Sequence, residues 1–422
     1  MRHEYKKLKI YYYLIFGLVF LVVLSLAWFF TQSFLTINIQ PKSANISIDN
    51  VPLVIKASGV AKKTLRPGKH TIRADASGYL GFQTEIELKR GVMKKFVITL
   101  NAAPEALGGG GLITMGNSLS ESYYLGDNGK TVYRAILGLN DENKAILLEN
   151  KQITPARISN VTELIWSPER DLSLMRKSNG DMNIFDYRKY DFVNQTDTLW
   201  GKYIGSVAWA PNSSEIAYYY KPPTGEQTLV FANTANSQYE RVYNFADSGI
   251  INPVLKWSPD SQWLMVIPKN RDRSTNYIYL FNAYNRTMKK LTESGNQVDA
   301  VFSPDSKKIV YATYSIDPKE TMPYALSIMN IDGDEKRSLG VRADLRKFAW
   351  FKDGKNALMV SYDEHASKDY IFKFNTETKA KSLAVNNIEN GKIESLVLMD
   401  NDKIMMYSSQ GKIYGLNTEV FN

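Results

Sequence analysis

The sequence of 422 residues contains no cysteine and only three histidines. The absence of cysteine excludes disulfide scaffolds, cysteine-ligated zinc and iron–sulfur sites, and thiol catalysis. A serine–histidine–aspartate site in the large C-terminal region would depend on His365, and no Gly-x-Ser-x-Gly motif accompanies it. We therefore expect neither a metal site nor a cofactor, and no catalytic residues.

Charge is absent from one long stretch near the N-terminus. Residues 10–30 form an uncharged, mainly apolar run, and a helix of that length spans about 30 Å of hydrocarbon. Four basic residues precede the run, namely Arg2, Lys6, Lys7 and Lys9, whereas the first basic residue after it is Lys42. The run therefore predicts a transmembrane helix over residues 10–30 that anchors the chain in the cytoplasmic membrane. The positive-inside rule then places residues 1–9 in the cytoplasm and the domains after the helix in the periplasm or at the cell surface. A cleavable signal peptide is the rival interpretation, but the run lacks a small-residue cleavage pattern.

The net charge of +9 is distributed unevenly, with +3 over residues 1–30, +7 over residues 31–101 and −1 over residues 102–422. A nucleic-acid-binding domain carries a concentrated basic face, so the neutral C-terminal region argues against nucleic acid as a partner. The basic excess lies in the small region before it. We predict an anionic-surface contact there through Lys62, Lys63, Arg66 and Lys69. A solvated surface that aids solubility is the alternative.

Residues 35–101 alternate between apolar and polar positions, as at Ile37 and Ile39 and again at Ile46 and Ile48. This period of two, interrupted by turn residues, predicts a small antiparallel β-sandwich. Three motifs follow one another in the region: Pro41-x-x-Ala44-x-Ile46-x-Ile48-Asp49, Leu65-Arg66-Pro67-Gly68-Lys69-His70-Thr71-Ile72 and Ala76-Ser77-Gly78-Tyr79. They resemble the PEGA domain, a small extracytoplasmic β-module of prokaryotic surface proteins. The resemblance implies a binding or spacer module without catalytic residues.

Residues 102–111 contain four consecutive glycines and predict a flexible linker. Beyond it, an aromatic residue followed by proline and then an acidic or amide residue recurs. The copies begin at Trp166, Trp209, Trp257 and Phe302, with a reduced copy at Trp350 and a weak one at Leu398. Each unit of 40 to 50 residues contains four strand patterns, which is typical of a β-propeller blade. The recurring aromatic predicts packing between blades rather than stacking on sugar rings.

The Trp-Ser-Pro-Asp pattern resembles the propeller repeats of the TolB family and the propeller that precedes the hydrolase domain of prolyl oligopeptidases. The resemblance covers residues 112–422 and implies a propeller without that hydrolase domain. Seven blades are favoured by the unit count, with six or eight as alternatives. The last unit has only three strands, so we expect a strand near residues 112–115 to complete it and close the ring. The predicted fold class is thus all-β with one N-terminal transmembrane helix, a small β-sandwich and a β-propeller.

Propellers place their interaction surfaces on the loops at the two ends of the ring. The partner-contact candidates on such loops are Arg157, Trp200, Arg271, Arg273 and Arg342. These residues form no catalytic constellation, so the predicted function is a membrane-anchored extracytoplasmic scaffold whose propeller binds a protein or glycan in the cell envelope. The alternative is an envelope glycan hydrolase or lyase that uses carboxylates on the propeller loops.

Overall fold

The computed structural model describes most of the chain. The described residues are 14–22, 31–100, 103–115, 120–126, 131–154, 161–169, 171–177, 184–211, 215–246, 248–315, 322–363, 368–385 and 391–421. Two compact units divide the chain, residues 1–103 and residues 104–421.

The prediction of a transmembrane helix over residues 10–30 is wrong. Within the described residues, no helix is both long enough and apolar enough to cross a membrane. Residues 14–22 are helical, and at a rise of about 1.5 Å per residue they extend for about 14 Å, roughly half the hydrocarbon thickness. The remaining positions of the predicted span lie outside the described residues. The predicted localisation, with a cytoplasmic N-terminus and the domains outside the membrane, depended on this helix. It is therefore wrong as well.

The small unit is a β-sandwich of two sheets, with strand orders β4-β1-β7 and β3-β2-β5-β6. β1 pairs antiparallel with β4 but parallel with β7, so the expectation of an entirely antiparallel sandwich is corrected at this edge. The strands are β1 (Ser33–Gln40), β2 (Asn45–Ile48), β3 (Val51–Leu53), β4 (Val60–Leu65), β5 (Gly68–Asp75), β6 (Phe82–Leu88) and β7 (Met93–Thr99).

The core of the small unit lies between these two sheets. Leu35, Ile37 and Ile39 of β1 point inward in turn, and they pack with Ile46 of β2 and Ile72 of β5 from the opposite sheet. Full burial of one such side chain contributes about 1.5–3 kcal/mol. The two-residue alternation of the sequence therefore produces the buried face that holds the sandwich together.

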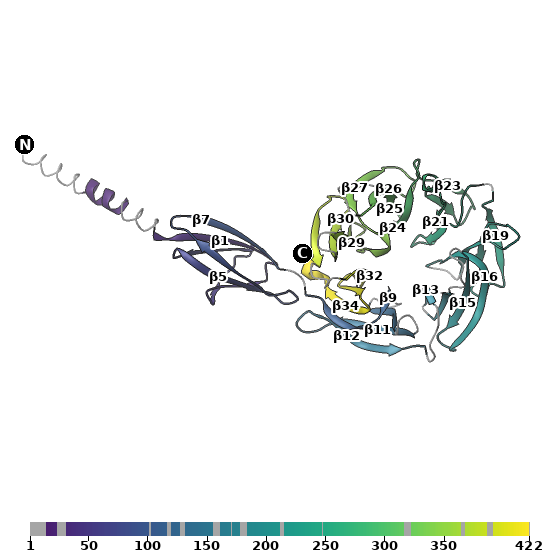
Figure 1. Ribbon diagram of the computed structural model, residues 1–422, viewed down its shortest axis with the longest axis horizontal. Coiled ribbons are helices and arrows are strands. Elements are labelled where there is room, and N and C mark those ends of the chain that lie inside the picture. Colours follow the sequence, from purple (N-terminus) through teal and green to yellow (C-terminus); the bar gives the residue numbers. More distant parts are fainter. Residues whose placement is uncertain are drawn as a thin grey trace, which may run out of the picture. The chain divides into compact units, whose positions relative to one another are not determined.

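The large unit is a β-propeller, and Figure 1 shows its blades arranged in a ring. The described strands form seven four-stranded blades, the number favoured by the repeat count. Blades 2 and 3 form one continuous sheet because the fourteen-residue strand β16 is the outermost strand of blade 2 and then the innermost strand of blade 3. The other blades are separate sheets.

The strands of blades 1 to 3 are β9 (Gly111–Met115), β10 (Glu121–Gly126), β11 (Thr131–Leu139), β12 (Ala145–Gln152), β13 (Val161–Trp166), β14 (Leu172–Lys177), β15 (Phe185–Asp191), β16 (Thr196–Trp209), β17 (Ile216–Tyr220), β18 (Thr228–Ala232) and β19 (Tyr239–Asn244). Those of blades 4 and 5 are β20 (Val254–Trp257), β21 (Trp263–Ile267), β22 (Tyr279–Asn282), β23 (Met288–Lys290), β24 (Gln297–Phe302), β25 (Lys308–Tyr314), β26 (Tyr324–Asn330) and β27 (Arg337–Arg342). Those of blades 6 and 7 are β28 (Phe348–Trp350), β29 (Asn356–Asp363), β30 (Lys368–Asn375), β31 (Lys381–Val385), β32 (Ile393–Met399), β33 (Ile404–Ser409), β34 (Lys412–Asn417) and β8 (Glu105–Gly109). Three short 3-10 helices are η1 (Arg273–Thr275), η2 (Leu345–Lys347) and η3 (Thr418–Phe421).

The ring closes by pairing the two ends of the propeller chain. β8 pairs antiparallel with β34 and completes blade 7, while β9 remains in blade 1. An N-terminal strand thus completes the last blade as predicted, but residues 105–109 perform this task instead of residues 112–115. The segment predicted as a flexible linker, residues 102–111, therefore contains a paired strand.

The repeated aromatic residue packs against the preceding blade, as predicted. Trp257 of blade 4 lies in one core cluster with Ala208 and Tyr219 of blade 3, and its Nε1 donates to the Ala208 carbonyl at 3.0 Å. Trp166 of blade 2 packs against Tyr123 of blade 1, with ring centroids 4.3 Å apart and the rings tilted by 34°. The motif therefore supplies the contact between successive blades.

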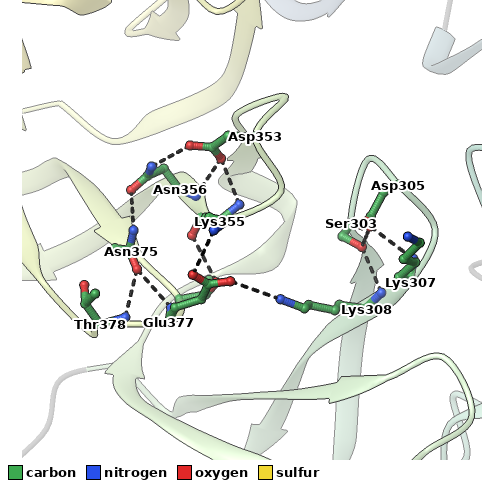
Figure 2. Close-up of polar contacts among 11 residues, drawn as sticks. Ser303, Asp305, Lys307, Lys308, Asp353, Lys355, Asn356, Asn375, Glu377 and Thr378 are labelled. Carbon is green, nitrogen blue, oxygen red and sulfur yellow. Dashed lines mark hydrogen bonds and ion pairs between the residues drawn. The ribbon is translucent and has the colours of Figure 1, made fainter.

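The Ser-Pro-Asp part of the motif builds the turn between the first two strands of a blade. Figure 2 shows this turn in blade 5, where Ser303 Oγ donates to Asp305 Oδ1 at 2.6 Å and the Lys308 amide donates to Ser303 Oγ at 2.9 Å. Ser306 adopts a φ of 59° to close the turn. Lys308 Nζ also lies 3.5 Å from Glu377 Oε1 of blade 6, so an ion pair links neighbouring blades beside the turn.

Candidate functional site

The two ends of the propeller carry different connections. Because successive strands of a blade are antiparallel, the Ser-Pro-Asp turns lie at one end. The loops between second and third strands lie at the other end, together with the connections from one blade to the next. We call this second end the interblade end, and it is where the sequence-based candidates were expected.

Charged side chains gather near the propeller axis toward this end. We call Glu163, Lys256, Lys269, Asp299 and Arg346 the axial charge cluster. Glu163, Lys256 and Asp299 belong to β13, β20 and β24, the innermost strands of blades 2, 4 and 5. Figure 1 shows β13 and β24 toward the centre of the ring. Lys269 follows β21, and Arg346 lies in η2.

The cluster is held by ion pairs and carbonyl contacts. Lys256 Nζ lies 2.7 Å from Asp299 Oδ1 and donates to the Ala300 carbonyl at 3.1 Å. Lys269 Nζ donates to the Val298 carbonyl. These contacts join blade 4 to blade 5 at the centre of the ring.

Two other pairs lie within single blades. Glu163 Oε2 lies 3.0 Å from Arg176 Nη1 in blade 2. Arg346 donates to Asp344 through Nε and Nη2, the latter at 2.7 Å, at the start of blade 6. Each of the carboxylates Glu163, Asp299 and Asp344 therefore has a cationic partner.

The electrostatics show a confined, charged environment. Burial by surrounding protein raises the pKa of Glu163, against the opposing effects of Arg176 and Lys256. Burial also lowers the pKa of Lys269, although this side chain remains accessible to solvent. Asp299 opposes that shift, whereas the charges of Lys256 and Arg346 add to it. Charges from blades 4, 5 and 6 thus act on one another at a single place.

Several exposed cationic groups lie on the loop between β21 and β22 and in η2 at this end. Lys269, Arg271 and Arg273 lie on the loop between β21 and β22, and all three are exposed. The side chain of Arg346 is 74% exposed. Asp272, which lies among them, accepts from the amide and hydroxyl of Ser274. This arrangement suits the binding of carboxylate or phosphate groups.

The predicted partner-contact residues occupy different settings. Arg271 is exposed, and the Arg273 guanidinium lies 4.3 Å from the ring centroid of Tyr314. Arg342 donates to the carbonyls of Ser315 and Met322, so it holds the loop between β25 and β26. Trp200 is 6% exposed and packs in the core between blades 2 and 3. Arg157 lies outside the described residues.

The small unit leaves Lys62, Lys63, Arg66 and Lys69 exposed, and their contact with an anionic surface stays a prediction. Its histidine has a structural environment. His70 Nδ1 lies 2.7 Å from Asp49 Oδ2, and Nε2 lies 2.7 Å from the Arg66 carbonyl. Among the residues that the structure describes, no three His, Cys, Asp or Glu side chains are grouped to hold a metal ion.

Sequence reasoning missed the axial charge cluster, although the repeat contained a signal. Glu163 and Asp299 both stand three positions before the repeated aromatic, and Lys347 stands there in blade 6. Alignment of the repeats at that aromatic would have shown charged residues recurring three positions before it.

Comparison with solved structures shows the fold of this chain. Hydrazine synthase from Kuenenia stuttgartiensis is 13% identical, with 75% of this chain and 98% of that chain covered and a TM-score of 0.50. TolB from Acinetobacter baumannii is 12% identical, with 78% and 80% covered and a TM-score of 0.42. The β-propeller domain of the Trilobed protease from Pyrococcus furiosus is 13% identical, with 74% and 95% covered and a TM-score of 0.46. At 13% identity, the similarity to hydrazine synthase concerns the fold alone.

No protein-family model matches the chain, and no curated protein matches it.

Proposed function

We propose that this chain is a non-catalytic binding and scaffold protein whose propeller binds anionic groups of a protein or glycan partner at its interblade end. The observation that carries the proposal is the group of exposed cations on the loop between β21 and β22 and in η2. Lys269, Arg271, Arg273 and Arg346 are exposed, while Glu163 and Asp299 are paired with cations near the axis.

The pairing of the carboxylates also supports a role without catalysis. A glycoside hydrolase needs two carboxyl groups that face the same bond, one acting as acid and the other as base or nucleophile. Asp299 accepts from Lys256, and Glu163 lies beside Arg176. A carboxylate engaged in this way must leave its cation before it can face a glycosidic bond.

The small unit fits a spacer or a second contact in this proposal. Its PEGA-like motifs and the exposed basic residues Lys62, Lys63, Arg66 and Lys69 support such a role. We further propose that nucleic acid is not a partner, because the basic excess at the interblade end is confined to a few residues between acidic ones.

The test uses the full chain and a partner identified by crosslinking in intact cells. The double variant Arg271→Glu with Arg273→Glu should weaken binding of that partner by at least about tenfold, which corresponds to about 1.4 kcal/mol. Binding by the unchanged chain should also weaken as salt is added, since exposed charges are screened. The affinity can be measured by titration calorimetry.

The matched control reverses two exposed lysines at the opposite end of the propeller. Lys307 and Lys379 lie on turns at that end, and Lys307→Glu with Lys379→Glu should leave the affinity unchanged. Equal binding by both double variants would refute the interblade end as the binding surface. If the chain cleaved a polysaccharide and Glu163→Gln abolished this activity, the alternative function as a glycan hydrolase would be established instead.

A further inference from the structure

A pocket of about 330 Å³ opens where β16 passes from blade 2 to blade 3. Its wall combines the middle of β16 with Tyr218 of β17 and with Tyr239 and Arg241 of β19. The volume is at the lower end of the range of about 300–1,000 Å³ for small-ligand sites. None of its lining residues belongs to the axial charge cluster.

The backbone at the rim of this pocket is strained. Tyr203 has a φ of 60°, a conformation that bulky residues rarely adopt, and the β-pairing of β16 is irregular on both sides of it. The resulting bulge presents the Tyr203 side chain, which is 43% exposed, at the pocket. Bulges commonly redirect a side chain beside a functional site, and local strain of this kind concentrates at such sites.

Aromatic rings line the pocket at several points. Tyr239 at the rim is 57% exposed, whereas Tyr218 is 5% exposed. Burial raises the pKa of Tyr218 to about 12, so its hydroxyl stays protonated and remains a donor. The pocket thus offers both flat apolar surfaces and phenolic hydroxyls.

Polar groups complete the pocket in fixed positions. Asn236 accepts from the Tyr218 hydroxyl at 3.2 Å and donates to the Trp200 carbonyl at 3.2 Å. Arg241 Nε lies 2.6 Å from Glu226 Oε1, which holds the guanidinium at the edge of the pocket. Lys202 adds an exposed ammonium group.

These features select the chemistry of the ligand. Aromatic cages recognise quaternary ammonium groups, but Lys202 and Arg241 would repel a cation here. A purely apolar ligand would cover the Lys202 ammonium and the N–H groups of Arg241 that do not face Glu226, without replacing their contacts with water. A pyranose ring has an apolar C–H face that stacks on an aromatic ring and a rim of hydroxyls for hydrogen bonds. We infer that this pocket binds one pyranose residue of a glycan, with Tyr203 as the stacking platform.

The experiment screens the full chain on a glycan array and then measures the strongest glycan by titration calorimetry. Tyr203→Asn removes the ring, and asparagine tolerates a positive φ, so the melting temperature should be unchanged or higher. The affinity for the glycan should nevertheless fall by at least about tenfold. A loss of binding without a loss of stability separates recognition from folding.

Tyr284 provides the matched control because it is 96% exposed and does not line the pocket. Tyr284→Asn should keep full affinity. The inference is overturned if no glycan on the array binds, or if Tyr203→Asn binds as tightly as the unchanged chain. The double variant of Arg271 and Arg273 should retain glycan binding at the pocket, so this inference and the proposed function can fail independently.

Discussion

At the joint between blades 3 and 4, the Trp257 Nε1 group of blade 4 donates to the Ala208 carbonyl of blade 3 at 3.0 Å. At the joint between blades 2 and 3, the corresponding residue is Trp209. Within the part of the chain that the structure describes, its Nε1 is buried without a hydrogen-bond partner. Within the described residues, the indole therefore makes a hydrogen bond at one of these two joints and not at the other, and Trp166 and Trp350 resemble Trp209 in this respect.

The connection between the blades also differs at these two joints. Residues 245–253 connect blade 3 to blade 4. Ser206 Oγ then donates to the Pro253 carbonyl at 2.5 Å across the joint. Blades 2 and 3 have no such loop, because β16 continues from one into the other. The strand bulges at Tyr203, and the pocket of about 330 Å³ lies beside the bulge.

The two joints show how a repeated motif can serve both stability and recognition. Both joints bury aromatic side chains. Where one strand serves two blades, the backbone is strained at Tyr203 and a pocket remains beside it. The following predictions test whether the joint between blades 3 and 4 is the stronger of the two.

The largest effect is expected from Trp257→Ala. This change removes a buried indole that packs on Phe231, with ring centroids 5.3 Å apart, and it also removes the hydrogen bond to Ala208. We expect the free energy of unfolding of the propeller to fall by about 3–5 kcal/mol. The midpoint of urea denaturation, followed by fluorescence, measures the change.

Phenylalanine at each position sharpens the contrast between the joints. Trp257→Phe keeps an aromatic ring but loses the donor, whereas Trp209→Phe removes a donor that has no partner among the described residues. Trp257→Phe should therefore be the more destabilising of the two by about 1 kcal/mol. Equal losses of stability would contradict the prediction that the joint between blades 3 and 4 is the stronger of the two.

Much of this architecture follows from local sequence patterns. The alternation at Ile37 and Ile39 gave one face of the sandwich core, and the spacing of the aromatic residues gave the blades. The sequence places the closing strand near residues 112–115 instead of 105–109, because consecutive glycines are typical of flexible linkers. Glycine has a low strand propensity, but β34 offers an edge whose backbone groups need partners, and residues 105–109 supply them.

The candidate sites were harder to predict because they depend on distant neighbours. Glu163 and Asp299 are separated by more than one hundred residues, yet both belong to innermost strands of the ring. The loop position of Arg271 and Arg273 predicts them as candidates. Lys256 lies within a strand, so a search of the loops does not select it. The positive φ of Tyr203 could not be predicted from the sequence, since tyrosine has no preference for that conformation.

A smaller effect is expected from Ser258→Ala in the turn of blade 4. Ser258 Oγ donates to Asp260 at 2.5 Å and accepts from the Trp263 amide at 3.0 Å. Blade 3 has Ala210 at this position, so the variant gives blade 4 the residue of its neighbour. We expect a loss of about 1 kcal/mol in the free energy of unfolding, measured by urea denaturation. Ser258→Thr retains the hydroxyl and should lose less; an equal loss would exclude these hydrogen bonds as the cause.

The smallest effect concerns pH at the joint between blades 3 and 4. Burial raises the pKa of Glu215 in blade 3, against the opposing charge of Arg286 in blade 4. The unfolded chain then releases this proton at a lower pH than the folded chain does. Glu215 consequently contributes stability below its ordinary pKa of 4.5, and this contribution is lost as the pH rises through the raised pKa of the folded state.

Glu215→Gln tests this linkage, because a neutral side chain cannot titrate. The variant should be as stable as the unchanged chain or slightly more stable at neutral pH, by less than about 1 kcal/mol, since a full unit of pKa shift corresponds to about 1.4 kcal/mol. Urea denaturation of both proteins across the acidic range measures the slope. Glu142→Gln is the matched control, because Glu142 of blade 1 is an exposed partner of Lys144 at 3.1 Å and its loss should give no gain in stability. If Glu215→Gln leaves the slope unaltered, the charge of Glu215 does not weaken this joint, and the contrast with the joint between blades 2 and 3 rests on packing alone.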